Sequence, residues 1–212
     1  MKKVSKKTLI LTSIITLFPV FAGLFLWNRL PDTIPTHFAM DGTPNGWSSK
    51  AFTVFGIPLF LLLVHFICLL FTTADPKYDN ISPKIFKLIV WTCPLISVLV
   101  VLSSYSIALG REIDVTRYTM TGMGIVFMVI GNYLPKCKQN YTMGIKIPWT
   151  LADEDNWNHT HRMAGFLWVI GGLVMIFSGF FQWEWLLLTV IVIITFLPMI
   201  YSYLFYRKKQ KQ

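Results

Sequence analysis

The chain has 212 residues, of which 54% are hydrophobic and only 14% charged, and its formal net charge is +9. With a mean hydropathy of +0.57, this composition excludes an ordinary soluble domain and is typical of a membrane protein. The basic residues lie at the ends of apolar segments and form no separate domain, which argues against direct nucleic-acid binding.

Long apolar segments run through most of the chain and predict its architecture. Five of them reach the roughly 18–20 residues that a helix needs to cross a bilayer, and the fourth is short by about two. Because backbone amides in lipid must be satisfied within the segment, we predict an all-α integral membrane protein, a bundle of six transmembrane helices. The segments are Thr8–Leu30, Ala51–Thr73, Leu88–Leu109, Thr119–Leu134, Met163–Phe181 and Trp185–Tyr206.

The distribution of charge predicts the orientation of these spans. If the basic N-terminus (Lys2, Lys3, Lys6, Lys7) is cytoplasmic, 15 of the 19 Lys and Arg residues fall on the cytoplasmic side, as the positive-inside rule expects. Both termini are then inside, and the first apolar run, which continues to Leu30, is a retained span and not a cleaved signal peptide. We predict a two-helix unit over residues 1–75 with an extracellular loop at 31–50, and a four-helix region over 76–212 with a cytoplasmic loop at 135–162.

The first polar loop, predicted outside, has the composition of a compact cap built as a small hairpin. Ile34, Thr36 and Phe38 alternate as in a strand, and Asp41-Gly42 and Asn45-Gly46 are turn signals. We interpret His37 as a surface histidine and not as a ligand.

Small residues in the predicted fifth span recur every seven residues, at Ala164-Gly165, Gly171-Gly172 and Ser178-Gly179. This period keeps them on one face and predicts a close helix contact, with a substrate groove as the alternative. A weaker strip of Gly122, Gly124 and Gly131 marks the fourth span. His65 is the ionisable residue that lies deep in a span; we expect a neutral, hydrogen-bonded histidine, with proton sensing as the alternative.

The second polar stretch, predicted on the cytoplasmic face, has the pattern of an amphipathic segment. Residues 144–149 should be extended, because a residue before proline avoids helical angles. Thr150 and Asp153 fit a capping box, so a helix from about Leu151 should run into the fifth span. On it Asp153, Trp157 and His161 share one face, and Glu154, Asn158 and Arg162 share another.

The same stretch lacks the patterns of known catalytic or metal sites. His159 and His161 are two residues apart and point nearly opposite ways on a helix, so they cannot chelate one metal ion. There is no H-E-x-x-H motif, nucleophile elbow or phosphate loop. We predict no enzyme activity, no metal and no cofactor, although an interfacial enzyme using these histidines stays open. Trp149 and Trp157 fit either an interfacial anchor or a surface that recognises a peptide, lipid or protein.

At these residues the chain resembles the SdpI family of bacterial membrane proteins. The resemblance rests on Gly131-Asn132, on residues 144–151 (Gly-Ile-Lys-Ile-Pro-Trp-Thr-Leu), and on Trp157 and Thr160-His161-Arg162. The first loop, with its Leu-Pro, Ile-Pro, His-Phe, Asp-Gly and Gly-Trp pairs between residues 30 and 47, resembles a small N-terminal domain of unknown function often joined to that signature. Two positions depart from the family pattern: Lys146 stands in place of arginine, and Asn156 in place of an aliphatic residue.

The resemblance implies a multi-pass protein of the bacterial plasma membrane that gives immunity to a secreted peptide toxin. It also implies a signalling role in which a cytoplasmic transcriptional repressor is held at the membrane. A small transporter or exporter is the alternative. Candidate partner-binding residues of the second loop are Asn132, Asn140, Gly144, Lys146, Pro148, Trp149, Thr150, Asp153, Trp157, His161 and Arg162. Candidates in the extracellular loop are Pro31, Pro35, His37, Asp41, Gly42 and Trp47.

Overall fold

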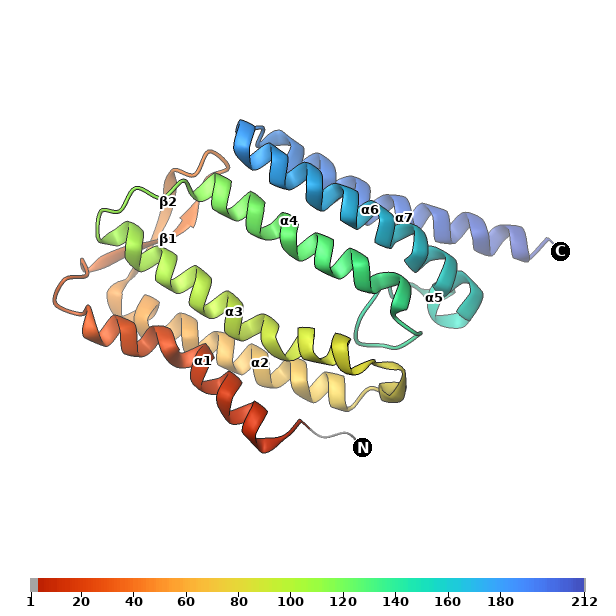
Figure 1. The fold of residues 1–212 in the computed structure, drawn as a ribbon, viewed down its shortest axis with the longest axis horizontal. Coiled ribbons are helices and arrows are strands. Elements are labelled where there is room, and N and C mark those ends of the chain that lie inside the picture. The colour runs from red at the N-terminus through yellow and green to blue at the C-terminus, as the bar shows by residue number, and fades with distance from the viewer. Residues whose placement is uncertain (1–3, 212) are drawn as a thin grey trace. The chain divides into compact units, whose positions relative to one another are not determined.

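The computed structural model describes residues 4–211, so Lys2 and Lys3 of the basic N-terminus lie outside the described residues. Each predicted apolar segment forms a helix (Figure 1). The long helices are α1 (Lys6–Phe25), α2 (Ile57–Thr73), α3 (Pro83–Ala108), α4 (Val115–Tyr133), α6 (Glu154–Phe181) and α7 (Trp185–Lys209). Shorter elements are β1 (Thr33–Phe38), β2 (Pro44–Ser49), the π-helix η1 (Phe52–Gly56), the 3-10 turns η2 (Tyr78–Asn80) and η3 (Leu134–Lys136), and α5 (Pro148–Ala152).

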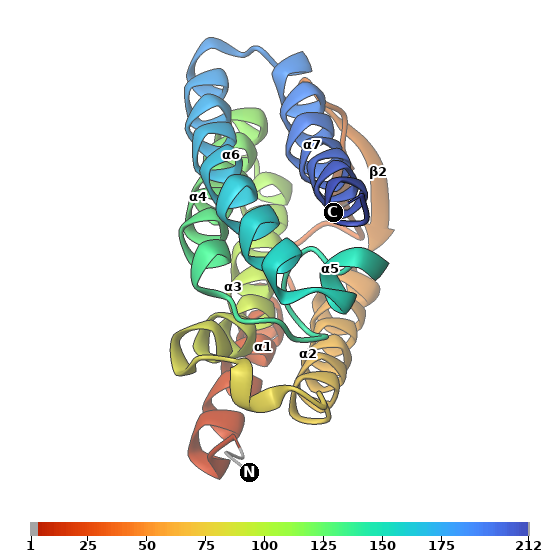
Figure 2. The same ribbon diagram turned by 90° about the vertical axis from the view of Figure 1, so that its right-hand side faces the viewer.

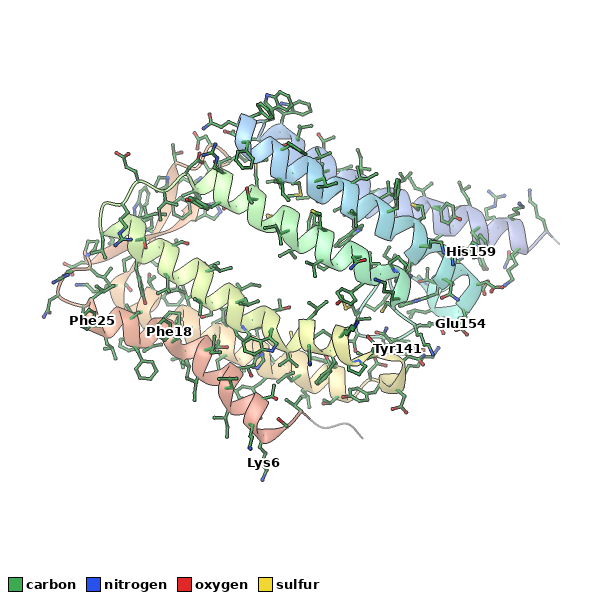
Figure 3. The ribbon with its side chains drawn as sticks, in the orientation of Figure 1. Lys6, Phe18, Phe25, Tyr141, Glu154 and His159 are labelled. Atoms are coloured by element: carbon green, nitrogen blue, oxygen red, sulfur yellow. The ribbon has the colours of Figure 1, made fainter. Side chains whose placement is uncertain are left out.

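Five of the helical segments among the described residues are long and apolar enough to cross a membrane: α1, η1 with α2, α3, α6 and α7. Their surfaces suit lipid. Phe18 and Phe25 project from α1 (Figure 3), and Phe25 is 88% exposed. Exposure of such large apolar side chains would be unfavourable in water. Within the described residues α4 does not join this set, because its first turns carry Thr116, Arg117 and Thr119. Five spans are thus supported, and the six-span arrangement stays a prediction.

The described chain divides into two compact units. One holds the residues up to Ala74 together with Phe86–Asp114, and the other holds Asp75–Ile85 and the residues from Val115 onward. Most of α3 therefore groups with the N-terminal helices, whereas the α2–α3 connection groups with the C-terminal helices. The boundary at residue 75 that we predicted from the sequence stays a prediction.

The first unit packs the hairpin onto its helices through a small apolar core. Leu30 and Ile34 are buried together with Val54, Val101 and Tyr105. Hydroxyl groups link the helices deeper inside: Ser97 Oγ donates to the Thr16 carbonyl (2.7 Å) and Tyr105 to the Pro19 carbonyl (3.1 Å).

His65 lies buried in this unit, with its Nε2 atom 3.0 Å from Thr12 Oγ1. The hydrogen-bonded histidine that we expected is therefore present. Its Nδ1 atom has no hydrogen-bond partner in the described part of the chain.

The cap is an antiparallel hairpin of β1 and β2, as the alternation of apolar residues predicted. The turn lies at Asp41 and Gly42, and Gly42 adopts a positive φ of 82°. Our second turn signal was wrong, because Asn45 and Gly46 lie within β2. There the Gly46 backbone lies opposite His37 at a bulge, and a Cβ at Gly46 would lie 2.9 Å from His37 Cβ. Gly46 is thus needed for this close approach and not for a turn.

In the second unit, α6 packs along α4 and α7 (Figures 1 and 2). The α4 contact is made backbone to backbone: a Cβ on Gly131 would lie 2.8 Å from the Gly165 carbonyl, and one on Gly124 2.5 Å from that of Gly172. Gly171, next in sequence, faces Val190 on α7 instead. The seven-residue pattern therefore marks a helix contact, as predicted. Gly122 was expected in it, but a Cβ there would meet nothing within 4 Å.

Candidate functional site: the loop between α4 and α6

The polar stretch folds as an ordered loop, which we call the signature loop and define as residues 137–153. Ile147 is extended (φ −117°, ψ 158°), as expected before a proline, and Pro148 begins α5. Thr150 is the third residue of α5, where its hydroxyl accepts from the Ile147 amide (3.1 Å) and donates to the Ile145 carbonyl (2.7 Å).

Two local expectations were wrong here. Trp149 is helical and not extended, because Pro148 already has the φ of a first helical turn. Thr150 does not cap one continuous helix from Leu151. Asp153 is extended (φ −136°, ψ 116°) and caps α6 by accepting from the Asp155 amide (3.0 Å). Aspartate is a strong N-cap, so the chain starts a new helix there.

Trp157 and His161 form the buried centre of the site. The Trp157 indole N–H donates to the Cys137 carbonyl (2.7 Å). His161 Nε2 accepts from the Ile145 amide (2.9 Å), and its Nδ1 donates to the Trp157 carbonyl (2.8 Å). These partners require the neutral tautomer with its proton on Nδ1. Of the predicted face, Trp157 and His161 are buried, whereas Asp153 precedes α6 as its N-cap and is half-buried. Glu154, Asn158 and Arg162 of the other predicted face are exposed.

Gly144 closes the loop over this pair. Its φ of +121° is strained for other residues, and a Cβ would collide with His161 Nε2 and lie 2.9 Å from the Trp157 ring. Asn140, fully buried, accepts from the amides of Thr142 (2.9 Å) and Met143 (2.7 Å). These two residues therefore shape the backbone of the loop.

Cys137 is enclosed by the same turn. Its sulfur lies 3.5 Å from the Met143 carbonyl oxygen and accepts from Asn140 Nδ2 at 3.3 Å. Burial raises the pKa of the Cys137 thiol, against a smaller opposite effect of the Asn140 hydrogen bond.

Residues of the α2–α3 connection, which the sequence did not suggest as site residues, hold the outer side of the loop. The buried Asp75 carboxylate accepts from the Tyr141 amide (2.9 Å) and the Thr142 hydroxyl (2.6 Å) through Oδ2, and from the Lys77 amide (2.8 Å) through Oδ1. Asn80 Nδ2 donates to the Gln139 carbonyl (2.7 Å).

Gln139, also unexpected, joins this connection to α5. Its Nε2 donates to the carbonyls of Thr150 (2.8 Å) and Leu151 (2.9 Å), and its Oε1 accepts from Lys77 Nζ. The sequence could not reveal these contacts, because Lys77 and Asn80 lie 62 and 59 residues away from Gln139.

The remaining candidates of the site are exposed, except for Trp149, which is half-buried. Trp149 packs against Tyr203 and Tyr206 of α7, with centroids 5.4 Å and 6.2 Å away, and Tyr141 lies in the open part of the loop (Figure 3). Arg162 is exposed and makes no hydrogen bond or ion pair with other described residues. Lys146 Nζ donates to the Tyr141 carbonyl (3.1 Å). Asn132 is exposed and accepts from Lys136 (3.1 Å), so it lies outside the buried centre.

The first turn of α6 is tied to the end of α7. Lys209 Nζ lies 2.9 Å from Asp153 Oδ2 and 3.0 Å from Asp155 Oδ2. Desolvation opposes ionisation of Asp153, but hydrogen bonds from Lys209 and from the Asp155 amide outweigh it and lower the pKa of Asp153. His159 lies apart from His161, exposed and stacked on Phe205 (4.8 Å).

Candidates in the outer loop lie on the hairpin and its entry. Pro35 is buried and pairs with Trp47, which is 59% exposed, and Pro31 is exposed. His37 Nδ1 lies 2.5 Å from Asn45 Oδ1 at the surface. Hydrogen bonds from the Thr43 side chain and backbone lower the pKa of Asp41. These residues form a surface and not an enclosed site.

The described residues contain no group of three or more His, Cys, Asp or Glu side chains that could hold a metal ion. Both nitrogens of His161 are engaged by the backbone, so it offers no lone pair to a substrate. The arrangement is that of an ordered loop that presents a surface.

Together, the apolar helices and the similarity to a family of membrane proteins, given below, define a multi-pass membrane protein. The model of the SdpI/YfhL protein family matches residues 136–202, and the model of DUF1648, a domain of unknown function, matches residues 14–62. The resemblance drawn from the sequence is thereby confirmed: a region similar to the SdpI/YfhL family follows a region similar to DUF1648.

The match to one relative covers nearly the whole chain. The Immunity protein SdpI of Bacillus subtilis (strain 168) is 28% identical over 203 residues, which are 94% of this chain and 96% of that protein. No solved structure matches the chain.

Proposed function

We propose that this protein is a bacterial plasma-membrane immunity protein that protects its cell against a secreted peptide toxin. The observation that carries the proposal is its similarity to an immunity protein over nearly the full length of both chains. That alignment covers most of the helices, and the region matched by the SdpI/YfhL family model covers the whole of the signature loop. Similarity of this extent supports a shared role and not only a shared segment.

Protection in this proposal is not enzymatic. Both nitrogens of His161 are hydrogen-bonded to backbone groups. The polar atoms of Asp75 and Gln139 are hydrogen-bonded to backbone groups, the Thr142 hydroxyl and Lys77. Groups used in this way stabilise a conformation and are not free to transfer protons. The loop is thus suited to recognition through its exposed residues.

Six spans with both termini in the cytoplasm complete the proposal. This orientation puts the hairpin outside, where a secreted peptide arrives, and the signature loop inside. An inner site that includes the half-buried Trp149 and the exposed Arg162 suits a cytoplasmic partner, for example the transcriptional repressor that the family resemblance implies. The toxin itself would be met at the hairpin or within the bilayer, and protection would in addition require the signature loop and its cytoplasmic partner.

The test is survival of a sensitive bacterial host. Cells that express the protein should outlive vector controls when challenged with spent medium of Bacillus subtilis (strain 168) or with a panel of membrane-active peptides. The variants Trp149→Ala and Arg162→Ala should lose this protection although they insert at normal levels.

Two matched controls lie outside the signature loop. Trp183 is exposed beyond α6 and Arg111 is exposed after α3, so Trp183→Ala and Arg111→Ala should protect like the parent chain. Unchanged survival with the parent chain against every challenge would refute the immunity proposal. Full protection by the Trp149 and Arg162 variants would show that the loop only anchors the protein at the membrane surface and has no role in recognition.

A further inference from the structure

The α2–α3 connection lies outside both family-matched regions, which cover residues 14–62 and 136–202. Its residues nevertheless belong to the same compact unit as the signature loop. Asp75 is 7% exposed, and burial of a carboxylate is unfavourable unless hydrogen bonds replace the lost water. Such a group needs a structural explanation.

The hydrogen bonds of Asp75 give that explanation. One oxygen accepts from the Tyr141 amide and the Thr142 hydroxyl, and the other from the Lys77 amide. A carboxylate that accepts three hydrogen bonds joins two segments 66 residues apart in sequence. Hydrogen bonds to a charged acceptor are about twice as strong as neutral ones, so this junction is a strong point of the loop.

The junction also continues directly from a membrane helix. The π-helix η1 follows β2 closely and runs into α2 without a break, and α2 ends at Thr73. The Ala74 amide still caps the helix by donating to the Leu70 carbonyl (2.9 Å), and Asp75 is the next residue. Asp75 therefore follows the end of α2 directly along the chain.

We propose that Asp75 is a positioning residue for the recognition surface, which orders residues 139–143 of the signature loop and links them to the end of α2. The inference rests on the proposed function of that loop. It assigns to the connection between the two family-matched regions a direct part in the site.

Cys137 is a built-in reporter for this role. Cys137 is 3% exposed, and its thiol is covered by the turn of residues 138–143. If Asp75 holds that turn, its loss should open the thiol to reagents. In a Cys68→Ala, Cys93→Ala background Cys137 is the remaining cysteine of the chain, and its reaction with a water-soluble maleimide can be timed on purified protein in detergent.

We expect Asp75→Asn and Thr142→Val to raise the Cys137 labelling rate at least tenfold, because each removes or inverts a partner of the junction. Thr142→Ser keeps the hydroxyl and should label at the parental rate. Asp79→Asn removes a negative charge at an exposed position of the same connection, and it should also be labelled at the parental rate. The double variant Asp75→Asn, Thr142→Val should label no faster than the faster single variant, because both remove one contact.

The inference would be overturned if Asp75→Asn were labelled at the same rate as Asp79→Asn. It would also be overturned if Thr142→Ser were labelled as fast as Thr142→Val. Survival separates the inference from the proposed function. Fast labelling with lost protection supports both. Fast labelling with full protection keeps Asp75 as a positioning residue and removes the loop from immunity.

Discussion

The Trp157 indole stacks on the His161 imidazole one turn further along α6, with ring centroids 3.9 Å apart and planes inclined by 20°. The loop closes on this pair from both ends, because Trp157 donates to the Cys137 carbonyl and His161 accepts from the Ile145 amide. The two buried side chains therefore form the core against which the backbone of the signature loop packs.

His161→Ala should lower the free energy of unfolding by about 1–3 kcal/mol, because it leaves the Ile145 amide without its acceptor. His159→Ala is the control, since His159 is exposed and its loss should change stability by less than about 0.5 kcal/mol. Thermal unfolding in detergent measures both. Equal melting temperatures for the two variants would contradict the structural role of His161.

Gly144→Ala should destabilise the protein by about 1–3 kcal/mol, since the backbone at φ +121° is strained for alanine and the new methyl group meets His161. Gly122→Ala is matched to it: Gly122 is helical with free space around its Cβ position, so alanine should be neutral or stabilising by up to about 1 kcal/mol. The two melting temperatures should move apart, and a parallel change would count against the described loop.

Asn156 departs from the family pattern, and the structure pairs it with α7. Its Nδ2 donates to the Ser202 carbonyl (3.0 Å), and its Oδ1 accepts from the hydroxyls of Ser202 (2.5 Å) and Thr160 (3.0 Å). Asn156→Ala should destabilise by about 1 kcal/mol, the usual range for a hydrogen bond between membrane helices.

A double-mutant cycle isolates that pair. Asn156→Ala combined with Ser202→Ala should destabilise by less than the sum of the single effects, whereas the exposed Asn158→Ala should be near neutral. Strict additivity in the melting curves would show that the two side chains do not interact.

The orientation of α4 is open to a direct test. If α4 crosses the membrane, a cysteine at Arg111, before the helix, and one at Tyr141, after it, lie on opposite sides. In a background without the three native cysteines, a membrane-impermeant maleimide should label Arg111→Cys on intact cells and Tyr141→Cys only after the membrane is opened. Labelling of both from the same side would exclude the six-span arrangement.

Sequence patterns predicted the helices well, because length and apolarity decide whether a segment can lie in lipid. They also predicted the β1 strand and the glycine contact of α6, since both depend on regular periods within one segment. They failed at Thr150, predicted as a helix cap, and at Asn45-Gly46, predicted as a turn. At both places contacts with other residues determine the role of the side chain or glycine. Thr150 serves the Ile145 and Ile147 backbone, and Gly46 makes room for His37.

Asp75 and Gln139 show why the site needed the structure. Each is a polar residue in a polar segment, and no spacing rule connects Asp75 with Tyr141 or Gln139 with Lys77. The sequence by itself determined that this is a helical membrane protein with an SdpI-like signature. The length of an apolar segment and the presence of a motif both depend only on residues that are contiguous in the chain. Only the tertiary structure decided which polar groups order the signature loop, because a buried hydrogen bond depends on which distant atoms the fold brings together.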